Sequence, residues 1–368
     1  MRFPEFTEEW REYAIGNVLS IGNGRDYKHL HNGDIPVFGT GGYMTSVDDF
    51  LYDGESVFIG RKGTINKPLY YNGKFWTVDT LFYTHSFVNV LPKFAYCLFQ
   101  TINWLKYNEA SGVPSLSKAT IEKIKVRVPS MDEQGKLSNQ LFLLDKRIEV
   151  QNKIIEKYES LIQAMCDTLI GKKTQQVMLS FNDFGESYSG LSGKSAEDFG
   201  EGSPYITYMN VYQNQIIDIT DIGLVKINKT EQQSLVQYGD ILFTLSSETP
   251  EEVGMGAVYL GETYPLYLNS FCFGIHITDE SKIFPPFLAY YVSSESFRKA
   301  VFPLAQGSTR FNLQKGDFLK KVFPFPAIEQ QRKIYSILKT YSDKLNIEKQ
   351  MIKLLCCQKQ YLLRQLFI

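Results

Sequence analysis

The chain has 368 residues, of which 43% are hydrophobic and 21% charged, and its formal net charge is −1. These values are typical of a globular protein of two or three domains, and they exclude a disordered or collagen-like chain. No apolar run approaches the ~20 residues of a membrane span, and no signal-peptide pattern follows Met1. Because the five cysteines show no C-x-x-C spacing, we expect a reducing cytoplasm and no cysteine zinc site.

Residues 1–128 predict a mixed α+β domain of short strands. Aromatic and β-branched residues alternate with turn-forming residues along this segment, a pattern that favours strands. We expect strands at residues 34–39, 56–60, 68–71, 76–78 and 125–128, and a helix near residues 94–106.

Residues 129–173 predict one long helix. Pro129 precedes the helix, and acidic residues occupy its first turn, where negative charge suits the helix dipole. From Leu137, alternating steps of four and three residues give a seam of ten positions, and nine of them are apolar. Gln151 is the exception. A sustained 3.5-residue period of this kind is typical of a coiled coil.

Residues 174–325 predict a second α+β domain. We expect strands at residues 205–208, 239–244, 257–260 and 321–323, and a helix near residues 286–301. Residues 190–195 resemble a phosphate-binding loop, but Tyr188 stands where that motif requires glycine, so we interpret them as a flexible loop. The segment carries ten basic and 17 acidic residues. This charge balance does not favour contacts with phosphate.

Residues 326–368 predict a second long helix, and they show that the chain is duplicated. The sequence PSMDEQGKL at residues 129–137 matches PAIEQQRKI at residues 326–334, an offset of 197 residues. The same offset carries the seam to residues 334–366, where eight of ten positions are apolar and Glu348 takes the place of Gln151. Such long apolar seams need a partner. We therefore expect the two helices to pair antiparallel, the alternative being that each packs on its own domain.

Catalytic motifs are absent from the sequence, whereas glycine-rich polar loops occur in both domains. These loops lie at residues 39–43, 60–64, 111–115, 244–249 and 306–312. Such loops allow close approach to phosphates and base edges, although each alone is more often an ordinary turn. We find no nucleophile–base pair and no histidine metal motif. The carboxylate cluster of a nuclease has too degenerate a pattern to be recognised in a sequence.

Several segments together resemble the specificity (S) subunit of type I restriction-modification systems. They are the two matched helix starts and residues 4–10 (PEFTEEW), 57–63 (VFIGRKG), 76–80 (WTVDT), 239–254 (GDILFTLSSETPEEVG) and 307–313 (GSTRFNL). The resemblance covers essentially the whole chain. The duplicated layout is more specific than any single motif.

This resemblance implies a non-catalytic protein that recognises a bipartite double-stranded DNA target. Residues 1–128 would be target-recognition domain 1, residues 129–173 the central spacer helix, residues 174–325 target-recognition domain 2, and residues 326–368 the C-terminal spacer helix. The helices would form an antiparallel coiled coil that docks two methyltransferase (M) subunits, which restriction/translocase (R) subunits join. S-adenosylmethionine, ATP and Mg²⁺ would belong to those partners, with no cofactor or metal bound by this chain, and the complex would be cytoplasmic.

From loop placement and the resemblance together, we expect four DNA contacts in each domain. They are Thr40, Tyr43, Arg61 and Lys62 in the first domain, and Ser246, Ser247, Arg310 and Asn312 in the second. Two other functions stay open from the residues alone. One is a DNA-binding nuclease with a degenerate carboxylate site, and the other is a coiled-coil scaffold protein.

Overall fold

The computed structural model describes residues 3–171, 176–228, 230–262 and 264–367. It divides into two compact units. Unit 1 comprises Met1–Lys153 with Lys349–Ile368, and unit 2 comprises Ile154–Glu348, so each long helix contributes to both units. The boundary expected between residues 173 and 174 lies outside the described residues.

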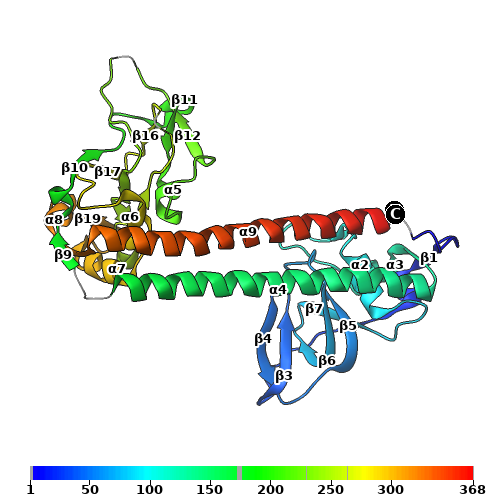
Figure 1. Ribbon diagram of the computed structural model, residues 1–368. Helices are drawn as coiled ribbons and strands as arrows, with labels where there is room; N and C mark the ends of the chain where they lie inside the picture. Colours follow the sequence, from blue (N-terminus) through cyan, green and yellow to red (C-terminus); the bar gives the residue numbers. More distant parts are fainter. Residues whose placement is uncertain (1–2, 172–175, 229, 263, 368) are drawn as a thin grey trace. The chain divides into compact units, whose positions relative to one another are not determined.

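Unit 1 is built on a six-stranded, mainly antiparallel sheet (Figure 1). The strand order is β2-β7-β5-β6-β3-β4, and a separate antiparallel pair joins β1 to β8. The strands are β1 (Arg11–Ala14), β2 (Ser20–Asn23), β3 (Asn32–Gly39), β4 (Gly42–Val47), β5 (Tyr52–Gly60), β6 (Leu69–Thr77), β7 (Leu81–His85) and β8 (Lys125–Val128). The helices before the long helix are α1 (Ile15–Val18), α2 (Pro92–Phe99), the 3₁₀ turn η1 (Trp104–Tyr107) and α3 (Lys118–Lys123).

The alternation of β5 explains why this sheet has two packed faces. Val57 and Ile59 point into the core that contains Phe94 of α2, whereas Phe58 joins an aromatic layer with Phe38 on the other face. Neighbouring side chains along a strand point to opposite faces, so a strand that is buried on both sides reads as a continuous apolar run.

Two expected strands, at residues 68–71 and 76–78, are in fact the single strand β6. The Asn72-Gly73 dipeptide between them predicts a turn, but Gly73 lies directly opposite Gly54 of β5. Both glycines have positive φ angles, +130° and +142°. Such angles are accessible to glycine without strain, which lets both strands distort together and the ladder continue.

In unit 2 the described strands form several smaller sheets in place of one six-stranded sheet. Its sheets have the orders β10-β17-β13-β15, β12-β11-β16 and β14-β19-β18, with a separate pair β20-β9. The strands are β9 (Gln176–Leu179), β10 (Gly185–Ser189), β11 (Phe199–Ile206), β12 (Ile222–Val225), β13 (Ile241–Thr244), β14 (Ser246–Ser247), β15 (Gly256–Val258), β16 (Tyr267–Leu268), β17 (Cys272–Ile277), β18 (Ala305–Gln306), β19 (Phe311–Leu313) and β20 (Phe323–Pro326). The pair β9–β20 precedes the second long helix just as β1–β8 precedes the first.

The helices of unit 2 surround an aromatic core. They are η2 (Phe181–Asp183), η3 (Ala196–Asp198), α5 (Tyr208–Gln213), η4 (Pro250–Glu252), α6 (Pro285–Tyr291), α7 (Glu295–Val301), η5 (Phe302–Leu304) and α8 (Lys315–Lys320). The one helix expected near residues 286–301 is two helices, because the Ser294 hydroxyl accepts a hydrogen bond from Phe297 N–H and caps a new start. The rings of Phe181, Phe243 and Phe318 pack against one another within this core.

The two long helices form as the sequence predicts. They are α4 (Met131–Ile170) and α9 (Ile328–Leu366), each an unbroken ribbon in Figure 1. Every one of the twenty seam positions is buried or half-buried, and the polar residues Gln151 and Glu348 are only 5% and 7% exposed. By contrast, Leu143 and Leu354, which lie off the seam, are 70% and 71% exposed.

A buried glutamine fastens each long helix to its own globular part. In unit 1, Gln134 Oε1 accepts a hydrogen bond from Leu91 N–H (2.8 Å), and its Nε2 donates to the carbonyls of Asn89 and Pro129 (3.0 Å each). In unit 2, Gln331 Oε1 accepts from Phe284 N–H (2.9 Å). Its Nε2 donates to the carbonyls of residues 282 and 326 at 2.9 and 2.8 Å.

The two glutamines are a matched pair in the sequence repeat, and neither has any exposed surface. Each glutamine accepts a hydrogen bond from the backbone N–H of an N-cap residue, Leu91 before α2 or Phe284 before α6, and proline follows in the first turn of both helices. We call these two sets of contacts the glutamine clamps.

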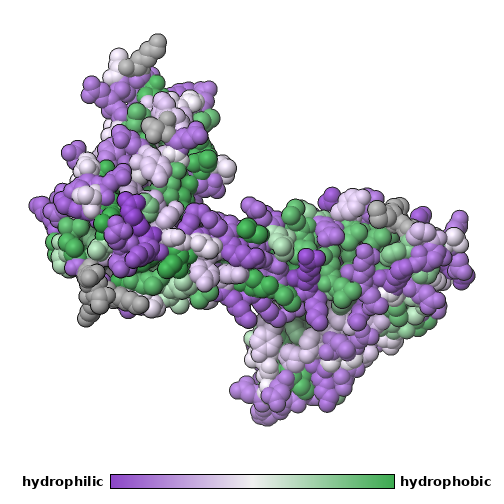
Figure 2. All heavy atoms as spheres, in the orientation of Figure 1, coloured by the Kyte–Doolittle hydropathy of each residue, from purple (hydrophilic) through white to green (hydrophobic). Residues whose placement is uncertain are grey.

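Hydrophilic side chains cover much of the face drawn in Figure 2, with hydrophobic patches interspersed. Within the residues that the structure describes, none of the helices combines the length and apolar character needed to cross a membrane.

Candidate nucleic-acid interface

The first cavity, of about 440 Å³, lies beside the end of β5 in unit 1. Three segments surround it: the residues after β5, the residues before β7, and the loop that precedes α3. Its lining residues are Arg61, Lys62, Asp79, Thr80, Ala110, Val113 and Ser115.

Backbone contacts fix the shape of the first cavity. Lys62 forms a β-bridge with Ser115, and Arg61 N–H donates to the Thr80 carbonyl (2.8 Å). The Arg61 guanidinium donates to the Asp79 carbonyl (3.3 Å) and lies 5.8 Å from the centre of the Phe82 ring. Both cationic side chains are exposed. This cavity therefore offers positive charge on a rigid frame.

The second cavity, of about 410 Å³, lies in unit 2 beside β14. Its walls come from α5, from β14 and the segment after it, from the turn before β17, and from the loop before β19. Its lining residues are Tyr208, Met209, Tyr212, Ser246, Ser247, Glu248, Glu252, Phe271 and Arg310.

Hydrogen bonds hold one wall of the second cavity in place. Tyr208 donates to the Ser246 carbonyl (2.6 Å), and its ring stacks on Tyr212. Glu252 accepts hydrogen bonds from Tyr212 (2.6 Å) and from the Thr249 hydroxyl (2.8 Å). These bonds lower the pKa of Glu252, and the same carboxylate raises the pKa of Tyr212 to about 12. Glu252 is therefore an ionised structural partner of the tyrosine pair.

The two cavities occupy equivalent places in the two units. Each lies beyond the end of a central strand, β5 or β13, and each is bounded by the residues before the neighbouring strand, β7 or β17. In each unit the residues after the central strand pair with a later segment, Lys62 with Ser115 in one and Ser246 with Asn312 in the other. The frame is thus repeated, whereas the side chains that line it differ.

Five of the eight expected DNA-contact residues line these cavities, and three do not. Arg61 and Lys62 line the first cavity, and Ser246, Ser247 and Arg310 line the second. Thr40 lies near the first cavity, since a Cβ atom built on Gly63 would be 3.8 Å from its Oγ1. Tyr43 is 64% exposed on β4, and its hydroxyl lies 3.1 Å from Ser46 Oγ. Asn312 is exposed on β19.

Ser246 and Ser247 differ from the exposed loop that the sequence predicts. They form the short strand β14, which pairs with β19, and are only 8% and 4% exposed. Sequence reasoning also missed Tyr208, Tyr212, Glu252 and Phe271. A Tyr-x-x-x-Tyr spacing on α5 is a weak signal for the first two, but no local pattern links Phe271 to this site.

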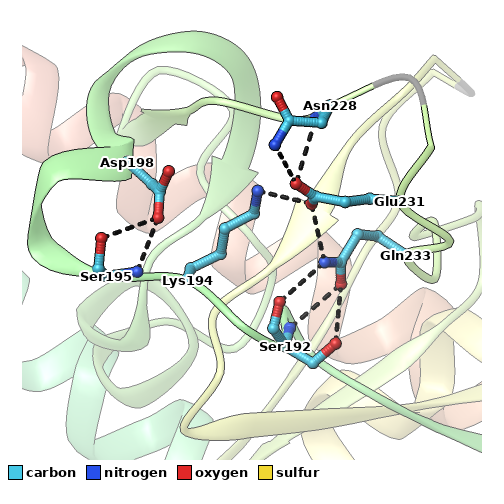
Figure 3. Close-up of polar contacts among 7 residues, drawn as sticks. All are labelled: Ser192, Lys194, Ser195, Asp198, Asn228, Glu231 and Gln233. Carbon is cyan, nitrogen blue, oxygen red and sulfur yellow. Dashed lines mark hydrogen bonds and ion pairs between the residues drawn. The ribbon is translucent and has the colours of Figure 1, made fainter.

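The loop at residues 190–195 is tied down on both sides rather than free (Figure 3). Lys194 forms an ion pair with Glu231 at 2.5 Å, and only 3% of the lysine side chain is exposed. Gln233 exchanges hydrogen bonds with Ser192. With Lys194, Gln233 lowers the pKa of Glu231 to about 2. Lys194, which stands where a phosphate-binding loop has its lysine, is therefore already paired with the Glu231 carboxylate.

Across residues 3–171, 176–228, 230–262 and 264–367, no three His, Cys, Asp or Glu side chains lie close enough together to hold a metal ion. Burial raises the pKa of Cys97 and of Cys166 to about 12, and it also raises the pKa of Cys272. Cys356 and Cys357 are exposed.

Comparison with known proteins identifies the family. The family model described as "Type I restriction modification DNA specificity domain" matches residues 7–160 and again residues 178–355. A type I restriction enzyme specificity subunit (MjaVIII) of Methanocaldococcus jannaschii is 24% identical over 328 residues, which cover 81% of this chain and 73% of that protein.

Two solved structures share the fold. The type I restriction-modification S subunit of M. genitalium has a TM-score of 0.64 and 18% identity, covering 100% of this chain and 97% of that one. A chain from a structure of the assembly and conformational transition of the type I R-M system has a TM-score of 0.58 and 13% identity, covering 99% and 98%. With two matched domains and a fold shared along its whole length, this chain belongs to the type I restriction-modification DNA specificity family.

Proposed function

We propose that each unit uses its cavity to read one half of a bipartite double-stranded DNA target, and that the chain itself is not catalytic. The observation that carries this proposal is the repeated frame. One topology places a cavity at the same point twice, lined once by Arg61 and Lys62 and once by Glu248, Glu252 and Arg310. A frame that is kept while its lining changes suits two half-sites of different sequence, because side chains at base edges specify the bases.

We further propose that α4 and α9 pair antiparallel and act as a spacer between the two half-site readers. Within unit 1, Leu141 and Leu363 belong to one apolar cluster. Four residues further along α4, Asp145 forms an ion pair with Lys359 at 2.5 Å, which is four residues back along α9.

Unit 2 supports the same pairing independently. Cys166 and Ile170, near the C-terminal end of α4, share one core with Ile334 and Leu338, near the N-terminal end of α9, as an antiparallel pair requires. Polar Gln151 and Glu348 lie at matched seam positions, where buried polar residues serve to fix register in coiled coils.

On this proposal, the chain binds DNA as part of a complex with two methyltransferase subunits and with restriction/translocase subunits. S-adenosylmethionine, ATP and Mg²⁺ belong to those partners, and the complex acts in the cytoplasm. The acidic balance of residues 174–325 fits partners that supply most phosphate contacts. The isolated chain is therefore expected to bind DNA weakly.

The test is to map methylated adenines across a host genome with and without this chain, in the presence of its methyltransferase subunit. The expected result is a split motif that is present with the chain and absent without it. The purified chain incubated with DNA and Mg²⁺ should leave the DNA uncut. Methylation that does not depend on the chain, or cleavage by the chain alone, would contradict the proposal.

A further inference from the structure

Three polar groups in the second cavity have no partner of their own. The Ser246 hydroxyl, the Glu248 carboxylate and the Arg310 guanidinium make no side-chain hydrogen bond or ion pair with any residue that the structure describes. Ser246 is only 8% exposed. Its hydroxyl oxygen is still reachable from the cavity, because Thr77 Oγ1 is the only buried side-chain polar atom without a partner among the described residues.

The opposite charges in this cavity do not neutralise each other. Glu248 and Arg310 line one space of about 410 Å³ without forming an ion pair with each other. Glu252 is already occupied by Tyr212 and Thr249. One acceptor and one donor group therefore remain available on the same cavity.

Two apolar side chains of the lining are open to solvent. Phe271 is 58% exposed and Met209 is 45% exposed, beside the stacked ring of Tyr208. Apolar side chains that line a cavity together with a few polar groups are typical of a ligand site. They are suited to contact a thymine methyl group or the face of a neighbouring base.

We propose that the second cavity reads one cytosine–guanine base pair, with Glu248 accepting a hydrogen bond from cytosine N4 and Arg310 donating to guanine O6 and N7. In the major groove, this pair presents one amino donor and two adjacent acceptors, which match a carboxylate and a guanidinium. The Ser246 hydroxyl can serve as donor or acceptor to either base. This inference rests on the proposed DNA-reading function.

A phosphate contact explains the cavity less well. A phosphate is attracted by an excess of positive charge, as in the first cavity, where the exposed Arg61 and Lys62 outnumber Asp79. Glu248 in the second cavity would repel it. The two equivalent cavities therefore differ in what they can accept, and only the second offers a carboxylate and a guanidinium that are both unpaired.

The experiment compares two variants of the full chain, Glu248→Gln and Arg310→Lys, each co-expressed with its methyltransferase subunit in a host that lacks the system. Methylated adenines are then mapped across the genome. Each variant should relax the same cytosine–guanine position in one half-site, with discrimination there reduced about 5- to 150-fold. The other half-site, read by unit 1, should be unchanged and acts as an internal control.

Arg310→Lys separates base reading from phosphate binding. Lysine keeps the charge that a phosphate needs but lacks the planar fork that binds guanine O6 and N7 together. Because Arg310 is exposed, the substitution should not affect folding. Glu251→Gln is the matched control, since Glu251 is exposed and lies outside the cavity lining.

Several results would overturn the inference. They are an unchanged motif in Arg310→Lys, relaxation at an adenine–thymine position, or uniform loss of methylation in variants that melt and assemble like the wild type. If the wild-type chain itself gives no split motif, the proposed function fails instead, and the two failures can be told apart.

Discussion

Removing one glutamine clamp should destabilise one unit and spare the other. In Gln134→Ala, Leu91 N–H and the carbonyls of Asn89 and Pro129 lose their partner. Gln134 has no exposed surface, so water cannot simply replace its amide. A buried backbone group left without a partner costs roughly 1–3 kcal/mol. With one donor and two acceptors affected, we expect a loss of about 3 kcal/mol in the free energy of unfolding.

The tryptophans make this loss measurable for unit 1 alone. The three tryptophans of the chain, Trp10, Trp76 and Trp104, all lie in unit 1. Trp104 is 1% exposed and Trp76 is 4% exposed, so their emission should change when unit 1 unfolds. For a urea m-value of about 2 kcal/mol/M, a loss of about 3 kcal/mol lowers the tryptophan-detected midpoint by about 1.5 M.

Two variants serve as controls for this measurement. Gln140→Ala changes an exposed glutamine on the same helix and should alter the free energy of unfolding by no more than about 0.5 kcal/mol. Gln331→Ala removes the equivalent clamp in unit 2, and it should leave the tryptophan midpoint close to that of the wild type. If Gln134→Ala shifts the midpoint no more than Gln140→Ala does, the clamp contributes little and the reasoning is refuted.

Three further predictions concern the seam, the tied loop and the thiols. Leu141→Ala should lower the free energy of unfolding of unit 1 by about 2–5 kcal/mol, whereas Leu143→Ala, at a position 70% exposed, should change it by no more than about 0.5 kcal/mol in the same urea titration. Equal effects would contradict the seam. The lowered pKa of Glu231, about 2, means that its ion pair stabilises the fold above pH ~4.5 and that this contribution is lost as the pH falls towards 2. The difference in melting temperature between the wild type and Glu231→Gln should therefore shrink over that pH range, and a constant difference would count against the ion pair. Iodoacetamide at pH 8 should modify Cys356 and Cys357 in the native chain and all five cysteines after denaturation, as measured by mass spectrometry. Native labelling of a buried cysteine would disprove the assignment.

The sequence predicts best those parts of the fold in which apolar residues recur at a regular spacing. The seam of α4 and α9 was predictable because a helix repeats its environment every few residues, and all twenty positions are buried or half-buried. Strands β3, β5 and β8 overlap the expected segments for a related reason, since they are dense in β-branched and aromatic residues.

Local rules failed where a distant residue decides the structure. Asn72-Gly73 predicts a turn, but Gly54 on the neighbouring strand lets β6 continue through it. Ser246 and Ser247 read as a polar loop, yet pairing with β19, more than 60 residues later, buries them. The walls of the second cavity come from four separate segments, so their convergence could not be read from any one of them.

The glutamine clamps use only main-chain groups of the globular parts they hold. Every partner that the Gln134 and Gln331 side chains have outside the long helices is a backbone N–H or carbonyl. The one side-chain partner, Met131 Sδ, belongs to α4 itself. Hydrogen bonds to backbone groups do not depend on which side chains the globular part carries. Mutations can therefore accumulate across a recognition surface, and alter the sequence it prefers, without loosening its attachment to the helix beneath.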